Sequence, residues 1–280
     1  MMGLMDVRRM CPHCRAFITN KDRVCPYCNE TVGPRAIDRR DPSPILGGFI
    51  PHARFNTILI LLVNFGLYVA STVFSMRSGN GSAFSGIDGE TLLYFGAKFG
   101  PLIAAGQWWR LVTAGFLHGN LLHILMNSWV LFDLGAQVEE IYGAARMWVI
   151  YFVSSVCGFY LSALWNPRVP SVGASAALMG LIGAMISLGV THRGSMGAAI
   201  RQVYIRWAVY ILLFSFLPGV DMAAHVGGVA SGFGLAYITG LPRFESSPVE
   251  RFWRVAAWIC ISLAVLSFLM WYWWFSRYAQ

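Results

Sequence analysis

Hydrophobic residues are concentrated in seven separate runs along the chain, and each run is bounded by charged residues or by segments containing glycine and proline. Most of these runs reach about 16–22 residues, long enough for a helix that crosses a bilayer. The predicted spans lie near residues 55–76, 111–135, 147–165, 172–190, 203–217, 222–240 and 254–275. The pattern therefore predicts an all-α fold, a polytopic membrane helix bundle.

The composition and the distribution of charge support this prediction. Hydrophobic residues make up 56% of the 280 residues and charged residues only 12%, whereas a soluble domain carries about 25% charged residues. The net charge of +8 could suggest nucleic-acid binding, but sixteen of the 21 lysines and arginines fall in the N-terminal tail or in loops on its side of the membrane. This is the positive-inside bias of membrane proteins, so we expect a cytosolic N-terminus and no polynucleotide site.

The first ten residues contain two arginines and no apolar core. A cleavable signal peptide needs such a core, so we expect the first span to direct insertion. The chain is accordingly predicted to be a multi-pass protein of the plasma (inner) membrane.

Four cysteines near the N-terminus form the pattern C-x2-C-x10-C-x2-C: Cys11, Cys14, Cys25 and Cys28. Two such knuckles supply the four thiolates of a tetrahedral structural zinc site, and residues 1–33 resemble the short zinc-ribbon domains. The competing interpretation, a redox CxxC pair, needs a βαβ unit that this segment is too short to form. His13 lies inside the first knuckle and is interpreted as a solvated turn residue.

Residues 34–54 are rich in proline and arginine and are predicted to be a linker into the first span. Two further cysteines, Cys157 and Cys260, lie singly in apolar runs and are predicted to be core residues.

Polar residues in the second predicted span raise the question of a function, because such residues are costly at membrane depth. His123 and Asn127 are four residues apart and so project from one face of a helix. His118 comes five residues before His123 and is expected to point away, closer to the aqueous surface. One interpretation is a pair of hydrogen-bond donors for a reaction; the other is a hydrogen bond to a neighbouring helix.

Two other predicted spans begin with residues that could complete a reactive site. Ser175 follows a Gly-Ala pair at the start of the fourth span, and His225 stands at a similar depth in the sixth. Both spans should run in the same direction, and both carry small residues that allow close helix packing. These small residues are Gly173, Ala176, Gly180, Gly183 and Ala184 in the fourth span, and Ala224, Gly228 and Gly232 in the sixth. We therefore expect the hydroxyl and the imidazole to come within reach of each other.

Four motifs carry a resemblance to a known family. These are WWRLVTAGFLHGNLLHILMN at 108–127, GAQVEEIYG at 135–143, GASA at 173–176 and AHVGG at 224–228. Their order and spacing resemble those of the rhomboid intramembrane serine proteases. The resemblance implies a six-helix protease core over 55–240, followed by a cytosolic loop and a seventh transmembrane helix within 241–280.

The resemblance also implies roles for individual residues. Ser175 would be the nucleophile and His225 the general base, without a cofactor for catalysis. His123 and Asn127 would stabilise the oxyanion together with the backbone N–H of Ser175, and His118 would support them. The substrates would be transmembrane proteins in the lipid bilayer, cleaved at a site that opens to the non-cytosolic face, and the zinc ribbon could bind a cytosolic partner.

Several positions depart from the family pattern. Ala176 follows the nucleophile where glycine is frequent, and Met179 stands where an aromatic residue often packs on the base. Gln107 replaces an expected acid and has no explanation from the sequence.

Two acidic residues are expected to have no role in the reaction. Glu139 is expected to be a structural acid. Asp221 could be a third triad member, but we favour a surface loop acid.

Two alternatives remain open. A catalytically inactive rhomboid-like protein would bind membrane clients without cutting them. A transporter would relay protons through its histidines, but the spans carry few other ionisable residues, Asp133 foremost, and no inverted repeat is visible.

The short loop 216–222 contains glycine and proline and is expected to be a mobile cap over the site.

Overall fold

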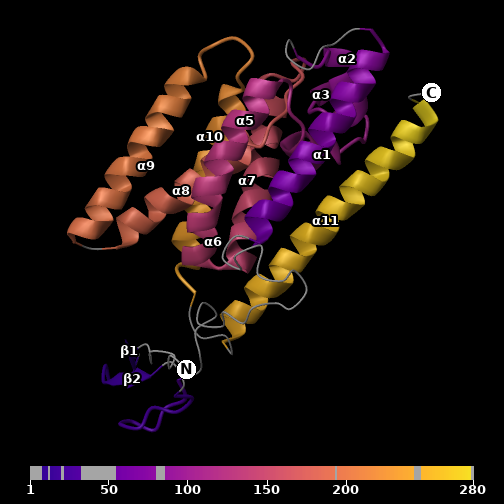
Figure 1. Ribbon diagram of the computed structural model, residues 1–280. Coiled ribbons are helices and arrows are strands. Elements are labelled where there is room, and N and C mark those ends of the chain that lie inside the picture. Colours follow the sequence, from indigo (N-terminus) through magenta and orange to yellow (C-terminus); the bar gives the residue numbers. More distant parts are fainter. Residues whose placement is uncertain are drawn as a thin grey trace, which may run out of the picture.

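The computed structural model describes residues 8–11, 13–19, 22–32, 55–79, 86–192, 194–242 and 247–278. The predicted linker at 34–54 lies outside the described residues. A small antiparallel sheet pairs β1 (Arg8–Met10) with β2 (Phe17–Thr19), and the other labelled elements are helices (Figure 1). The helices are α1 (Phe55–Arg77), α2 (Gly89–Phe95), α3 (Gly100–Ala104), α4 (Arg110–Thr113), η3 (Ala114–Phe116), α5 (Leu121–Val130), η4 (Leu131–Gly135), α6 (Ala136–Tyr142), α7 (Ala144–Trp165), α8 (Ser175–Thr191), α9 (Ser195–Phe214), α10 (Met222–Thr239) and α11 (Pro248–Tyr278).

Helical segments occur in all seven predicted spans, which confirms the helix bundle. Four of them are both long and apolar enough to cross a membrane: 55–77, 121–142, 144–165 and 248–278. Helix α8 is also apolar but has only 17 residues. The chain is therefore an integral membrane protein with a helical core.

The second span differs from its predicted bounds of 111–135. The continuous helix runs from Leu121 to Tyr142 and contains the π-helical turn η4. It begins late because the side chain of Asn120 accepts a hydrogen bond from His123 N at 2.8 Å and caps the helix. It ends at Gly143, whose φ of 79° breaks the helix. Apolarity alone did not reveal these boundaries.

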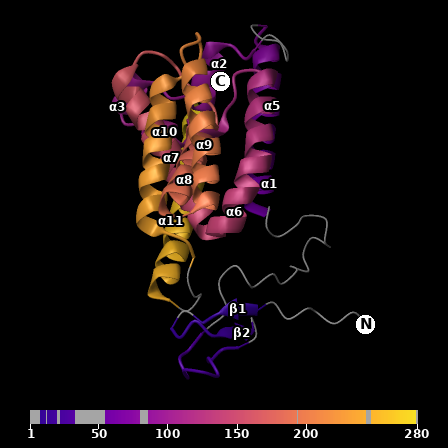
Figure 2. The ribbon, with the colours of Figure 1, turned by 90° about the vertical axis from the view of Figure 1, so that its left-hand side faces the viewer.

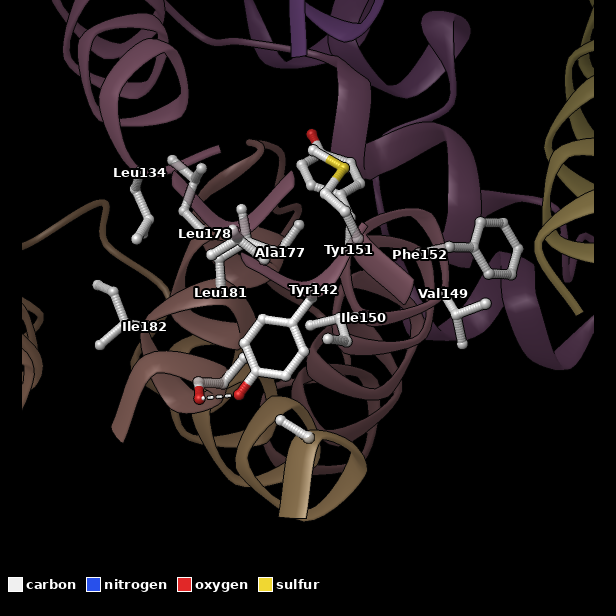
Figure 3. Packing of buried hydrophobic residues seen from close by; sticks show 14 of the residues in the cluster. Leu134, Tyr142, Val149, Ile150, Tyr151, Phe152, Ala177, Leu178, Leu181 and Ile182 are labelled. Carbon is white, nitrogen blue, oxygen red and sulfur yellow. Dashed lines mark hydrogen bonds between the residues drawn. The ribbon is translucent and has the colours of Figure 1, made fainter. Parts of the chain in front are cut away.

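The largest apolar cluster among the described residues draws on most of the helices, and α7 and α8 contribute most of its buried members. Figure 3 shows Ile150, Leu178 and Leu181 from this cluster together with Tyr142. The Tyr142 hydroxyl donates a hydrogen bond to the carbonyl oxygen of Ala184 at 2.9 Å. This bond satisfies the one polar atom that Tyr142 brings into the apolar interior.

Small residues bring α7, α8 and α10 into backbone contact, and the three helices lie side by side in both views (Figures 1 and 2). A Cβ added to Gly228 would clash with the backbone of Ala176, and one added to Gly232 would clash with the backbone of Gly180. The contacting positions advance by four residues on both helices, so α8 and α10 run parallel. This confirms the close packing that the small residues predicted.

The C-terminal helix α11 is an integral part of the bundle and reaches from the β-sheet end to the opposite end (Figure 1). Near its start, Glu250 forms a buried, two-pronged ion pair with Arg146 at 2.5 and 2.8 Å. Near its end, the indole N–H of Trp271 donates to the carbonyl oxygen of Tyr94 at 2.9 Å. Helix α11 is therefore bonded through its side chains to both α7 and α2.

Glu139 at the end of the second span binds the first turn of α1. Its two carboxylate oxygens accept four hydrogen bonds of 2.8–3.2 Å from the backbone and side chains of Asn56 and Thr57. A carboxylate at this position satisfies free N–H groups and complements the positive end of the helix dipole. The contacts agree with the structural role expected for Glu139.

The segment before the second span is organised around one buried arginine. The guanidinium of Arg110 lies 4.7 Å from the ring of Trp109 and 5.2 Å from that of Trp274. It donates hydrogen bonds to the carbonyl oxygens of Leu93 and Ala97. Its Nε donates to Oε1 of Gln107 at 2.7 Å, which explains the glutamine that the sequence left unexplained.

Candidate functional site

Ser175 and His225 meet at the starts of two parallel helices. Ser175 is the first residue of α8 and His225 lies in the first turn of α10. The Oγ of Ser175 is 2.8 Å from Nε2 of His225, a hydrogen-bond distance. His225 is only 4% exposed, while Ser175 is partly exposed. A nucleophile and a base within this distance can transfer a proton.

Helix α8, which begins at Ser175, is short. Its 17 residues span about 26 Å, less than the roughly 30 Å of a hydrocarbon core. The segment leading to it is held in place by backbone pairing between Lys98 and Ser171, and the buried Lys98 ammonium donates to the carbonyl oxygen of Val169 at 2.8 Å. Gly173 N then donates to the carbonyl oxygen of Ala114 at 2.9 Å.

His123 and Asn127 face the approach to the serine. A Cβ added to Gly173 would lie 2.7 Å from both Cε1 and Nε2 of His123 and 3.6 Å from Nδ2 of Asn127. The two α5 side chains therefore lie close to the backbone two residues before Ser175, which agrees with the shared helix face that their four-residue spacing predicted. Nδ2 of Asn127 is buried and has no hydrogen-bond partner among the described residues, so it is a donor available to a ligand.

His118 is placed differently from the prediction that it lies close to the aqueous surface. It precedes α5, its side chain is completely buried, and its ring packs edge-to-face on His123 with the centroids 5.1 Å apart. Its position behind His123 follows from the late start of the helix at Leu121. His118 contacts the candidate site through His123.

The carboxylate of Asp221 binds groups other than the imidazole of His225, although the backbone carbonyl of Asp221 accepts a hydrogen bond from His225 N at 3.1 Å. Asp221 is the N-cap of α10, and its side chain accepts from the backbone N–H of Ala224 at 3.0 Å and from the hydroxyl of Ser162. The favoured interpretation as a surface loop acid was incomplete, since this acid caps a helix. Both carboxylate oxygens are engaged away from the imidazole.

One neighbour of His225 was missed in the sequence. The Oγ of Ser215, the residue that ends α9, is 2.6 Å from Nδ1 of His225. No motif contains this serine, and only its position just before the 216–222 loop could have drawn attention to it.

The two residues after Ser175 that differ from the usual family pattern, Ala176 and Met179, are both buried. Ala176 is completely buried and its backbone packs against Gly228. Met179 is 1% exposed and belongs to the main apolar cluster. The two lone cysteines agree with their predicted packing in part, since Cys260 is buried in the same cluster while Cys157 is half-buried.

The four N-terminal cysteines form a second candidate site. Their sulfur atoms all lie within 4.8 Å of one another, with Cys11–Cys28 at 3.7 Å and Cys14–Cys25 at 3.6 Å. Four sulfurs around one zinc ion at 2.3 Å would be about 3.8 Å apart. The donor set and its spacing therefore fit a tetrahedral metal ion.

The two knuckles have the same backbone form. In the first, Arg15 N donates to the Cys11 carbonyl, and in the second, Asn29 N donates to the Cys25 carbonyl. Arg15 and Asn29 both adopt a left-handed conformation, with φ of 61° and 54°. The matching turns aim two pairs of thiols at one point.

The thiols of the cluster differ in acidity. Desolvation raises the pKa of Cys11, but hydrogen bonds with the backbone of Cys14 and His13 outweigh it and lower this pKa to about 6. The backbone of Glu30 lowers the pKa of Cys28, yet burial and the neighbouring thiols raise it to about 12. A divalent cation would favour thiolates at all four positions.

Comparison with known proteins identifies the region that contains Ser175 and His225. Residues 105–242 match the family described as the Rhomboid domain. The chain is 37% identical over 155 residues to "Rhomboid protease GluP" of Bacillus subtilis (strain 168), covering 55% of this chain and 30% of that protein. It is 37% identical over 177 residues to "RHOMBOID-like protein 7" of Arabidopsis thaliana, covering 61% of this chain and 56% of that protein.

A third relative is covered over most of its length. The chain is 33% identical over 210 residues to "Rhomboid-like protease 2" of Toxoplasma gondii, which covers 72% of this chain and 70% of that protein. By contrast, the chain spans less than two thirds of the length of the two relatives above. The long match and the domain match agree with each other, and the chain therefore belongs to the rhomboid family.

Proposed function

We propose that this protein is an intramembrane serine protease that hydrolyses peptide bonds in or near the transmembrane segments of other membrane proteins. The observation that carries the proposal is the 2.8 Å contact between Ser175 Oγ and His225 Nε2. The names of the relatives GluP and Rhomboid-like protease 2, both called proteases, support it.

In the proposed reaction, Nε2 of His225 takes the hydroxyl proton of Ser175 while Oγ attacks the scissile carbonyl carbon. The tetrahedral intermediate collapses, the C–N bond breaks, and His225 gives its proton to the leaving amine. Water then attacks the acyl-enzyme: His225 accepts a proton from the water and returns one to Ser175 Oγ. These two residues account for every proton transfer in the cycle.

Three donors are available for the developing oxyanion. The N–H of Ser175 lies in the first turn of α8, where helix N–H groups have no carbonyl partner within the helix. His123 and Asn127 flank the preceding backbone, and Nδ2 of Asn127 has no other partner among the described residues. Removal of one such donor typically lowers the rate by about 10²–10³.

We further propose that the site opens to the non-cytosolic face and that residues 216–222 act as its cap. Phe216 is 77% exposed and Leu217 is 50% exposed. These apolar side chains stand directly between Ser215 and the start of α10. The positive-inside bias of the sequence supports a cytosolic position for the opposite end of the bundle.

The N-terminal cluster is proposed to hold a structural Zn²⁺ ion through Cys11, Cys14, Cys25 and Cys28. A bound zinc ion would cross-link the two knuckles, which bury only a few apolar side chains, such as Ile18 and Val32. The resulting ribbon is a candidate surface for a cytosolic partner.

The test uses the purified full-length chain in liposomes with a fluorogenic transmembrane peptide. Ser175→Ala should abolish cleavage and labelling by a fluorophosphonate probe. Ser187→Ala is the matched control, because Ser187 is a buried serine about three turns further along α8. Cleavage by both variants would end the protease hypothesis, and a correctly folded wild type without activity would favour the inactive rhomboid-like protein.

A further inference from the structure

We infer that Ser215 is a positioning residue that fixes the tautomer of His225 and replaces the acid of a catalytic triad. The inference rests on the proposed function, because it concerns the same histidine. Its basis is a chain of three short contacts through the imidazole. Ser175 Oγ is 2.8 Å from Nε2, Nδ1 is 2.6 Å from Ser215 Oγ, and Ser215 Oγ is 2.6 Å from the carbonyl oxygen of Ile211.

The number of protons available decides the direction of each bond. A serine hydroxyl has one proton, and a carbonyl oxygen has none. Two oxygen atoms at 2.6 Å need a proton between them, so Ser215 donates to Ile211. The contact between Ser215 Oγ and His225 Nδ1 must then use a proton on Nδ1. The neutral ring consequently has its lone pair on Nε2, where the proton of Ser175 has to be accepted.

The neighbouring acid cannot set this tautomer. Among the described residues, Asp221 is the carboxylate closest to His225 in the chain, and its oxygens accept from Ala224 N and from Ser162. The hydrogen bond from Nδ1 therefore goes to a neutral hydroxyl, and this group is a serine on a different helix.

The position of Ser215 at the end of α9 gives the hydroxyl a favourable electrostatic setting. Ser215 is the C-cap of α9, and its backbone N–H also points back to the carbonyl oxygen of Ile211. The carbonyl groups at a helix C-terminus carry a partial negative charge that stabilises a nearby cation. A hydroxyl polarised by such a carbonyl is a better acceptor for the Nδ1–H of an imidazolium ion.

Every proton in the reaction has a defined position in this arrangement. During attack, the proton of Ser175 moves to Nε2, and the ring becomes positively charged. The Nδ1 proton stays on the ring and the Ser215 proton stays directed at Ile211. The bond between Nδ1 and Ser215 is therefore stronger in the transition state than in the ground state, so it should affect kcat more than KM.

The experiment compares three variants of the full-length protein in the liposome cleavage assay. Ser215→Ala should lower kcat by about 10- to 100-fold with little change in KM, as expected for a lost hydrogen bond to a charged group. Ser215→Thr, which keeps the hydroxyl, should restore most of kcat. Ser267→Ala is the matched control, since Ser267 is a buried serine that donates to the carbonyl oxygen four residues earlier, in α11. It should behave like the wild type.

A second measurement that does not depend on turnover tests the inference even if a variant fails to fold. The ¹⁵N NMR shifts of His225 in the wild-type protein should report a protonated Nδ1 and an unprotonated Nε2. A ring protonated on Nε2, or Ser215→Ala with the kcat of the wild type, would overturn the inference. If the wild type cleaves nothing and Ser175 reacts with no probe, the proposed function fails instead, and the NMR measurement still decides the tautomer.

Discussion

Replacing Gly173 by alanine is the sharpest test of the proposed oxyanion site. Gly173 has a φ of +135°, which an L-residue rarely adopts. Its missing side chain leaves the space in which the His123 ring lies, because an added Cβ would be 2.7 Å from Cε1 and Nε2 of that ring. The substitution therefore disturbs both the backbone before Ser175 and a proposed oxyanion donor.

The expected magnitude follows from these two effects. The backbone strain should lower the free energy of unfolding by about 1–3 kcal/mol. The clash is separate, since ordinary contacts begin at 3.4 Å and the ring must move away by several tenths of an ångström. Misplacement of a catalytic group by about 1 Å can cost 10²-fold in rate, and loss of a donor costs about 10²–10³. We therefore expect kcat to fall by about 10²-fold.

Gly194 provides the matched control. It also has a positive φ, +101°, but an added Cβ would meet nothing within 4 Å. Gly194→Ala should therefore show the strain without the clash. Thermal unfolding in detergent, followed by tryptophan fluorescence, should give similar losses of stability for both variants, while only Gly173→Ala should lose turnover of the fluorogenic transmembrane peptide.

Two results would refute this reasoning. If Gly173→Ala keeps the turnover of the wild type, the His123 ring does not need its present position. If Gly194→Ala loses as much turnover as Gly173→Ala, the loss comes from backbone strain and not from the contact with His123.

Three further predictions concern parts of the chain outside the Ser175–His225 pair. Glu139→Ala should lower the free energy of unfolding by about 2 kcal/mol or more, because the first turn of α1 loses an ionic cap; an unchanged melting curve would contradict the cap. Arg146→Ala and Glu250→Ala should each cost about 3–5 kcal/mol, whereas the double variant should cost less than their sum; strict additivity would argue against the buried ion pair. Cys11→Ser should reduce the zinc content measured by mass spectrometry while the membrane core keeps its turnover; complete loss of cleavage in folded protein would make the two modules dependent on each other.

Spacing along the chain was enough to predict two of the side-chain clusters. The cysteine spacing predicted a cluster of four thiols, and the sulfurs lie within 4.8 Å of one another. The four-residue spacing of His123 and Asn127 predicted a shared helix face, and both residues flank Gly173. These expectations are reliable because spacing along one turn or one helix translates directly into position.

Contacts between helices were predicted less completely. Apolarity placed the second span at 111–135, but the cap at Asn120 and the break at Gly143 decide that it runs from Leu121 to Tyr142. Gln107 had no explanation until its side chain was found to bind the buried Arg110. Capping and burial depend on side chains whose partners hydropathy does not identify.

The amino-acid pattern alone predicts the approximate positions of the apolar helices and the asymmetry of the charges. Spacing and family motifs identify the serine and the histidine that are expected to react together. The position of Ser215 against the far side of His225, and the binding of Asp221 elsewhere, depend on the folded arrangement. This division arises because periodicity states only which residues share a face of one helix. How two helices approach and where each ends depend on packing of small residues such as Gly228 against another backbone, and this packing brings α9, α8 and α10 together at a single imidazole.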